Sequence, residues 1–135
     1  MSLGSGVVSW RSHKQLVPTN STTESEYVAA AEATKEIVWL RKILEDLQVK
    51  QVQSTPLMID NISAIKLAKN PKFHDRTKHI NTKYHMIRHH VEAKTIHLHH
   101  CSTNEKVVDI FTKALGRENL ERFRTMLGIA NIPSY

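Results

Sequence analysis

Three acidic residues, far apart in the sequence, occupy positions from which their carboxylates could converge. Glu26 lies near the start of a long predicted helix, Asp60 follows a short apolar stretch, and Asp109 lies in a later predicted helix. Mg²⁺ prefers oxygen ligands, and two such ions about 4 Å apart need several carboxylates around them. A cluster of this kind suits metal-assisted hydrolysis of a phosphodiester bond.

The helical phase of Glu26 places it on the side of the helix that is expected to face the core. At about 100° per residue, Ile37 lies about 20° from Glu26, Leu40 about 40°, and Leu44 almost in line. A carboxylate that faces a core costs free energy unless it is paired or bound to a metal. The same position also fits a carboxylate at the rim of the core that reaches water or pairs with a lysine.

Asp60 and Asp109 each fit two interpretations. Asp60 ends an apolar strand that is followed by a helix, and ligands of open α/β sheets bind at such strand ends. It fits equally well as an aspartate that shares a helix cap with Asn61. Asp109 flanks an apolar stripe, and its position alone is also that of an ordinary surface aspartate.

The elements that must position these residues can be predicted from capping and apolar spacing. Residues 7–12 have the composition of a strand. A capping box at residues 21–24 opens a helix to about Leu47, with a stripe of Ile37, Leu40, Leu44 and Leu47. Strands over 56–60 and 95–99 alternate with a helix that Asn61 caps and with another helix over 80–92.

Two more helices are predicted near the end of the chain. A second capping box, residues 102–105, opens a helix that Gly116 ends, with Val107, Ile110, Phe111 and Ala114 on one side. A last short helix contains Leu120, Phe123, Met126 and Leu127. Alternating strands and helices predict an α/β fold, a mixed sheet flanked by helices with some parallel pairing. Residues 1–6 are expected to be extraneous to the natural protein and to lie outside one truncated domain that spans 7–135.

Composition favours an intracellular protein with a polyanionic partner. The net charge is +6, which favours nucleic acid without deciding for it. The single cysteine, Cys101, excludes an internal disulfide and suits a reducing compartment. No secretory signal or membrane span is evident, so we expect a cytoplasmic location, with the nucleus as an alternative.

Several segments together resemble the ribonuclease H domain of copia-type LTR retrotransposon Pol polyproteins. The resemblance covers residues 6–128 and rests on residues 9–15 (SWRSHKQ), 21–30 (STTESEYVAA), 35–41 (KEIVWLR), 60–65 (DNISAI), 70–80 (NPKFHDRTKHI), 84–88 (YHMIR) and 109–115 (DIFTKAL). It implies a ribonuclease H-like fold. It also implies cleavage of the RNA strand of RNA:DNA hybrids during reverse transcription, with two Mg²⁺ (or Mn²⁺) ions held by four carboxylates. Three of those carboxylates correspond to Glu26, Asp60 and Asp109.

This sequence departs from the family pattern at its start. The family's first catalytic aspartate lies on a first strand that precedes the Ser-Trp-Arg-Ser segment, and nothing acidic precedes Glu24 here. The resemblance therefore implies a domain that is incomplete at the N-terminus, with an incomplete two-metal site and weak or absent catalysis. We also expect a homodimer formed by strand exchange, because absent strands leave edges unpaired.

Basic residues and histidines add further candidate sites. Arg76, Lys78, His79, Lys83 and Arg88, with His89 and His90, would form a ridge that follows nucleic-acid phosphates, or simply a solvated helix face. His85 and His89 have the spacing of a zinc pair but lack a third ligand at motif spacing. His97, His99 and His100 with Cys101 fit an opportunistic metal patch. Trp10 and Trp39 are predicted to be core residues.

Two functions of different classes fit these observations. The first is an RNase H-type endonuclease, impaired in this chain. The second is a non-catalytic, host-expressed remnant of a retroelement that binds nucleic acid or a protein.

Overall fold

The computed structural model describes residues 1–3, 6–9, 22–69, 78–102 and 105–129. In chain order, its elements are β1 (Ser2–Leu3), β2 (Gly6–Val7), α1 (Thr22–Asp46), β3 (Thr55–Ile59), α2 (Ile62–Lys69), α3 (Lys78–Glu92), β4 (Ile96–His100), the 3₁₀ helix η2 (Val107–Phe111) and α4 (Arg117–Met126). From α1 to β4 this order is the predicted one. No helix in these ranges is both long and apolar enough to cross a bilayer.

The chain forms two compact units, which are described separately. Unit 1 comprises residues 1–16 and 103–135, and unit 2 comprises residues 17–102. Unit 2 contains Glu26 and Asp60, whereas Asp109 belongs to unit 1. Residues 2 and 3, part of the segment expected to lie outside the domain, form β1 and pair with β2 in an antiparallel hairpin.

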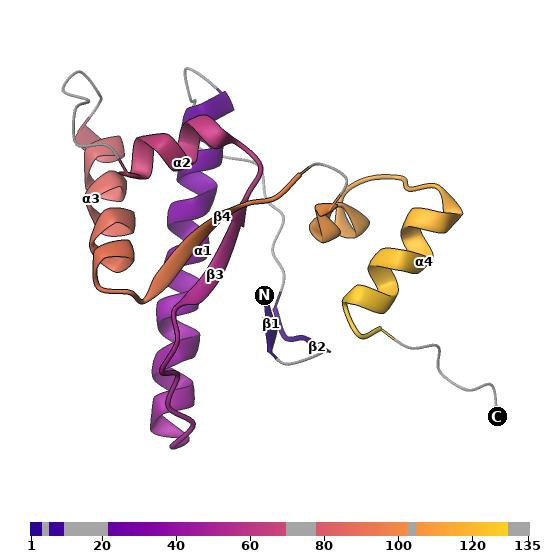
Figure 1. Ribbon diagram of the computed structural model, residues 1–135, viewed down its shortest axis with the longest axis horizontal. Coiled ribbons are helices and arrows are strands. Elements are labelled where there is room, and N and C mark those ends of the chain that lie inside the picture. Colours follow the sequence, from indigo (N-terminus) through magenta and orange to yellow (C-terminus); the bar gives the residue numbers. More distant parts are fainter. Residues whose placement is uncertain (4–5, 10–21, 70–77, 103–104, 130–135) are drawn as a thin grey trace. The chain divides into compact units, whose positions relative to one another are not determined.

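Unit 2 is built on a two-stranded parallel sheet, which confirms the predicted mixed α/β class and parallel pairing. β3 and β4 pair in register, with Leu57 opposite Leu98. Parallel strands require a crossover, and α2 and α3 supply it (Figure 1). Residues alternate along both strands, so that one face buries Leu57, Ile59, Ile96 and Leu98 while the other remains exposed.

The fully buried residues of α1 end at Ile37, and the predicted stripe is confirmed only in part: Ile37 is buried, Leu40 and Leu44 are half-buried, and Leu47 is exposed. The buried residues are Tyr27, Ala30, Ala31, Thr34 and Ile37, while Leu47 is 66% exposed and Trp39, expected in the core, is 57% exposed. Figure 1 shows the reason: α2 and α3 lie beside the first half of α1, and its other end extends beyond them. Trp39 is exposed for another reason, because it lies about 160° around α1 from the buried Ile37 and so faces the opposite way.

The C-terminal half of α1 is held instead by a polar contact. The guanidinium of Arg41 donates hydrogen bonds to the carbonyl oxygens of Gln51 and Gln53, at 2.7 and 2.8 Å, and to Thr55 Oγ1 at 2.9 Å. These bonds tie the segment that leads into β3 to the helix. Arg41 is thus the residue through which α1 sets the starting point of β3.

Three other predictions, about one strand, one helix and the end of that helix, differ from the structure. The strand predicted over 7–12 is present only as Gly6–Val7, since Val8 and Ser9 lie outside β2 and residues 10–12, with Trp10, lie outside the described part. The helix predicted from the second capping box is the short 3₁₀ helix η2, whose N-cap Lys106 makes no side-chain capping hydrogen bond. Gly116, expected to end that helix, adopts an extended conformation (ψ 151°) as the N-cap of α4.

The outer edge of β3 bears on the predicted strand exchange. Among the described residues, β3 pairs with β4 alone. Strand exchange between two copies through that edge stays a prediction.

Candidate functional site

Asn61 connects the end of β3 to the start of α1. Its side-chain oxygen accepts hydrogen bonds from the backbone N–H groups of Ser63 (2.9 Å) and Ala64 (3.3 Å), which confirms the predicted cap of α2. Its side-chain nitrogen donates to Thr23 Oγ1 at 3.3 Å. The first turn of α1 therefore lies beside the carboxyl end of β3.

This contact brings two of the candidate carboxylates to the same end of unit 2. Glu26 follows Thr23 by about one helical turn, and Asp60 directly precedes Asn61; both residues are half-buried. The next residue of α1, Tyr27, is buried, and its hydroxyl donates to the carbonyl oxygen of Tyr84 at 3.3 Å. That bond and the stacked rings of the two tyrosines, 5.6 Å apart, hold the first turns of α1 against α3.

The donor chemistry at this end of unit 2 fits a hard cation. Mg²⁺ is commonly held by one or two carboxylates, with waters and substrate phosphates completing its shell. Glu26 and Asp60 could supply those two carboxylates. In the described part of the chain, no three or more His, Cys, Asp or Glu residues stand close enough to share a metal ion.

Asp109 is a buried carboxylate, which corrects its interpretation as an ordinary surface residue. It is 7% exposed and lies in η2. Its Oδ2 accepts a hydrogen bond from Lys113 Nζ at 2.8 Å, which supplies the partner that a buried carboxylate requires. Because Asp109 lies in unit 1, its meeting with Glu26 and Asp60 stays a prediction.

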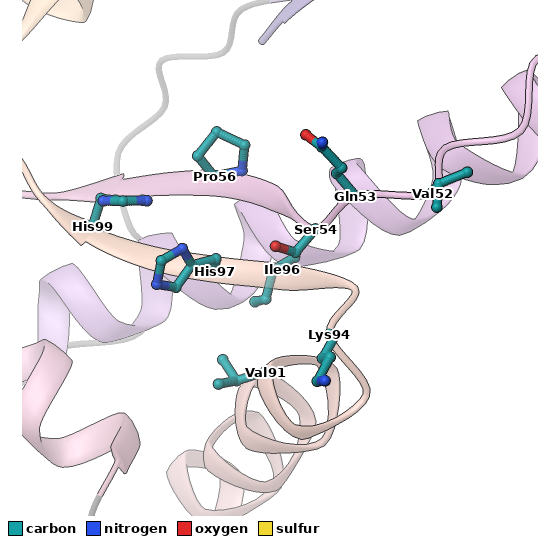
Figure 2. Close-up of a pocket in the computed structure, with 9 residues that line it drawn as sticks. All are labelled: Val52, Gln53, Ser54, Pro56, Val91, Lys94, Ile96, His97 and His99. Atoms are coloured by element: carbon teal, nitrogen blue, oxygen red, sulfur yellow. The ribbon is translucent and has the colours of Figure 1, made fainter.

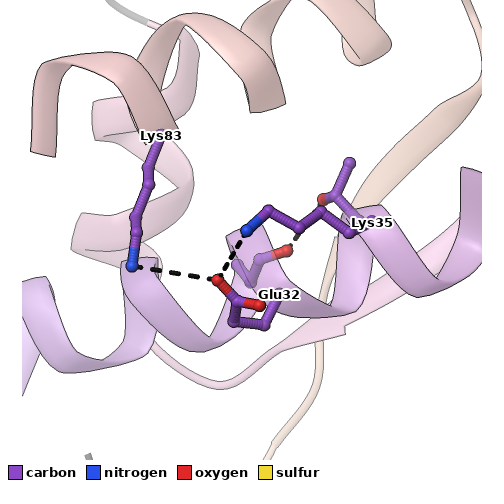
Figure 3. A network of polar contacts seen from close by, with 5 residues as sticks. Glu32, Lys35 and Lys83 are labelled. Atoms are coloured by element: carbon purple, nitrogen blue, oxygen red, sulfur yellow. Dashed lines mark hydrogen bonds and ion pairs between the residues drawn. The ribbon is translucent and has the colours of Figure 1, made fainter. Parts of the chain in front are cut away.

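Two of the basic residues predicted to contact phosphates, Lys83 and Arg88, lie on different sides of α3, and the predicted ridge stays a prediction. Lys83 and Arg88 are five positions apart on α3, which separates them by about 140° around the helix. Lys83 Nζ lies 3.9 Å from Glu32 Oε1 on α1, which also binds Lys35 Nζ at 2.9 Å (Figure 3). Arg76 lies outside the described residues, and Lys78 and His79 belong to α3 with undescribed side chains.

Arg88 is engaged within its own helix. Its Nε donates to Glu92 Oε1 at 2.7 Å, and this hydrogen bond raises the pKa of the guanidinium above its ordinary value. Among the residues of α3 whose side chains are described, Thr82, His85, His89 and Glu92 are exposed. Lys83 and Arg88 are half-buried, and each lies beside a glutamate, so a bound phosphate would compete with that glutamate.

Comparison with known proteins places the chain among retroelement sequences. It is 40% identical over 124 residues to the retrovirus-related Pol polyprotein from transposon TNT 1-94 of Nicotiana tabacum. It is 34% identical over 131 residues to the corresponding polyproteins from transposons RE1 and RE2 of Arabidopsis thaliana. The chain is homologous to plant transposon Pol polyproteins.

These matches cover nearly the whole chain but a small part of each relative. The chain is matched over 92–97% of its length, and it spans 9% of each polyprotein. No family model and no solved structure matches it. The homology supports a retroelement-derived protein. The matched region includes Glu26, Asp60 and Asp109 together with most of the elements described above.

Replacing Asn61 tests its two roles separately. Asn61→Ala removes the cap of α2 and the bond to Thr23, and we expect it to lower the free energy of unfolding by about 1 kcal/mol, measured by urea denaturation. Asn61→Asp keeps the capping oxygen and removes only the donor to Thr23, so its cost should be smaller. Equal losses in both variants would mean that the cap contributes nothing.

Proposed function

We propose that this chain is part of an RNase H-type nuclease domain of a retrotransposon polyprotein, which hydrolyses the RNA strand of RNA:DNA hybrids. The observation that carries the proposal is the Thr23–Asn61 hydrogen bond, which holds Glu26 and Asp60 at the same end of unit 2. The homology to Pol polyproteins supports the class of protein, and the parallel β3–β4 pair with its helical crossover supports a ribonuclease H-like fold.

Glu26, Asp60 and Asp109 would hold the Mg²⁺ or Mn²⁺ ions of this site. Bound ions of this kind polarise a phosphate and lower the pKa of a bound water. The protein's part is to present the carboxylates in a fixed arrangement. Asn61 fixes the position of Asp60 through the cap of α2 and the bond to Thr23. The Tyr27–Tyr84 contact fixes the helix that carries Glu26.

We further propose that the chain as given catalyses poorly. The resemblance implies a fourth carboxylate on a strand that precedes residue 9, and the eight residues present there include no Asp or Glu. A metal ion that lacks one charged ligand binds less tightly and orients its substrate less well. We therefore expect this chain to bind an RNA:DNA hybrid but to cleave it slowly or not at all.

The test compares two proteins and three substrates. One protein is the 135-residue chain; the other carries, at its N-terminus, the segment that precedes the matched region in the tobacco relative. Each is incubated in Mg²⁺ with a labelled RNA:DNA hybrid, the matched DNA duplex and the matched RNA duplex. We expect the extended protein to cleave the hybrid's RNA strand and neither control. An extended protein that binds hybrid without cleaving it would favour the non-catalytic alternative.

Nucleic-acid binding is expected to be weak and to depend strongly on salt. The motivation is the net charge of +6 together with Lys83 and Arg88 on α3. Binding of the 135-residue chain to a fluorescent hybrid, followed by anisotropy, should weaken steadily as KCl rises from 50 to 200 mM, because counterions are released. Lys83→Ala and Arg88→Ala should each reduce the slope of log affinity against log salt by about 1.

Lys42→Ala serves as the matched control for these two variants. Lys42 is an exposed lysine on α1, outside the predicted basic set, and its replacement removes the same charge. If it reduces the slope as much as Lys83→Ala does, binding reflects net charge alone and the assignment of Lys83 and Arg88 is wrong.

A further inference from the structure

The outer face of the β3–β4 sheet carries two histidines that the proposed nuclease does not use. His97 and His99 are two positions apart on β4, so both project from the same face of the sheet. Both are exposed, whereas Ile96 and Leu98 between and beside them are buried on the opposite face. Figure 2 shows both rings on this face, near Pro56 of β3.

The two rings are close enough to share one ion. Their centroids lie 4.2 Å apart with an angle of 64° between the planes. Metal–nitrogen bonds of about 2.0–2.1 Å place each ring centre about 3 Å from a bound ion. At the observed separation of the centroids, the angle between the two nitrogen–metal bonds would be somewhat below 90°. That angle is nearer to the angle between adjacent ligands in a tetragonal site than to the wider angle of the tetrahedral sites that zinc prefers.

The surroundings leave room for an ion and its remaining ligands. The two histidines line an open hollow together with Gln53, Ser54 and Lys94 (Figure 2). None of the described residues that line this hollow is Asp or Glu, so the ligands from the protein would be the two imidazoles, and water would complete the shell. Lys94 carries the one positive charge of the lining, and its side chain is exposed to solvent.

We propose that His97 and His99 form a two-histidine surface site for a late first-row divalent cation, with Cu²⁺ bound more tightly than Ni²⁺ and Ni²⁺ more tightly than Zn²⁺. Imidazole suits these metals, and square-planar or tetragonal nitrogen sites select Cu²⁺ and Ni²⁺. The site is separate from the Mg²⁺ site proposed above, whose oxygen ligands are on α1 and at the end of β3. It does not depend on the nuclease being active.

The test is a metal titration of the untagged 135-residue chain followed by two readouts. Isothermal titration calorimetry with CuCl₂, NiCl₂ and ZnCl₂ compares the unchanged protein with the double variant His97→Gln/His99→Gln. The double variant is expected to lose the tightest Cu²⁺ site. In NMR spectra with Cu²⁺ below one equivalent, the amide signals of residues 96–100 and of Leu57 and Met58 should broaden before any others.

The matched control is a second exposed histidine pair in the described part of unit 2, His85 and His89, four positions apart on α3. The variant His85→Gln/His89→Gln is expected to keep the tightest site. The proposal is overturned if this variant loses that site while His97→Gln/His99→Gln retains it, if the signals around His85 and His89 broaden first, or if Zn²⁺ binds more tightly than Cu²⁺.

Discussion

Asp60→Asn in the N-terminally extended protein is expected to lower the rate of hybrid cleavage by about 10²–10³. The amide keeps the size of the side chain but removes the charge that would neutralise a bound cation. Glu26→Gln should have an effect of the same order. Because the two carboxylates would serve the same ions, the double variant should lose less than the product of the two single losses.

Matched substitutions outside the candidate site make this result interpretable. Asp46→Asn and Glu45→Gln change the same chemical groups at the exposed, distant end of α1, and both should leave the cleavage rate unchanged. Binding of Mn²⁺, followed by electron paramagnetic resonance, should weaken in Asp60→Asn and Glu26→Gln and not in the controls. Full activity in either site variant would remove that carboxylate from the proposed metal site.

Asp109 needs a stability measurement beside the rate. Its carboxylate is buried and bonded to Lys113, so Asp109→Asn changes a structural ion pair as well as a candidate metal ligand. A loss of activity with unchanged thermal stability would support the metal-binding role, and equal losses of both would indicate the structural one. The 135-residue chain itself should cleave hybrid at least about 10² more slowly than the extended protein.

Ile87→Ala is expected to destabilise unit 2 by about 2–5 kcal/mol, the largest effect on stability among the substitutions considered. Ile87 is 0% exposed and lies on the buried face of α3, one turn after Tyr84. Removal of its side chain leaves a cavity where α3 packs into the core of unit 2. Ile87→Val, which removes a single methylene group, should cost about 0.5–1.5 kcal/mol.

Ile62→Ala is the control for this substitution. It is the same chemical change at a position on α2 where the side chain is 51% exposed. Its cost, from urea denaturation followed by circular dichroism, should stay below about 1 kcal/mol. Similar costs for Ile62→Ala and Ile87→Ala would mean that α3 does not pack as described.

Local features of the sequence were sufficient to predict the elements of unit 2. The capping side chain of Asn61, the short apolar stretches around Leu57 and Leu98 and the helical spacing of Tyr84 and Ile87 act over a few residues, and the structure contains each. The parallel pairing of β3 and β4 also follows, because two strands joined by a helical crossover pair in parallel. Asp60 therefore belongs at a strand end on local grounds alone.

Only the tertiary structure decided which residues of these elements are covered. Leu47 has the spacing of the predicted stripe, yet it is exposed because α2 and α3 pack beside the first part of α1. Trp39, predicted to be a core residue, is exposed because it lies on the face of α1 opposite the buried Ile37. The spacing of apolar residues specifies which face of a helix is apolar. How much of that face is buried depends on where distant segments of the chain pack against it. The same holds for the Thr23–Asn61 bond, which joins residues 38 positions apart, and for the burial of Asp109 in a short 3₁₀ helix.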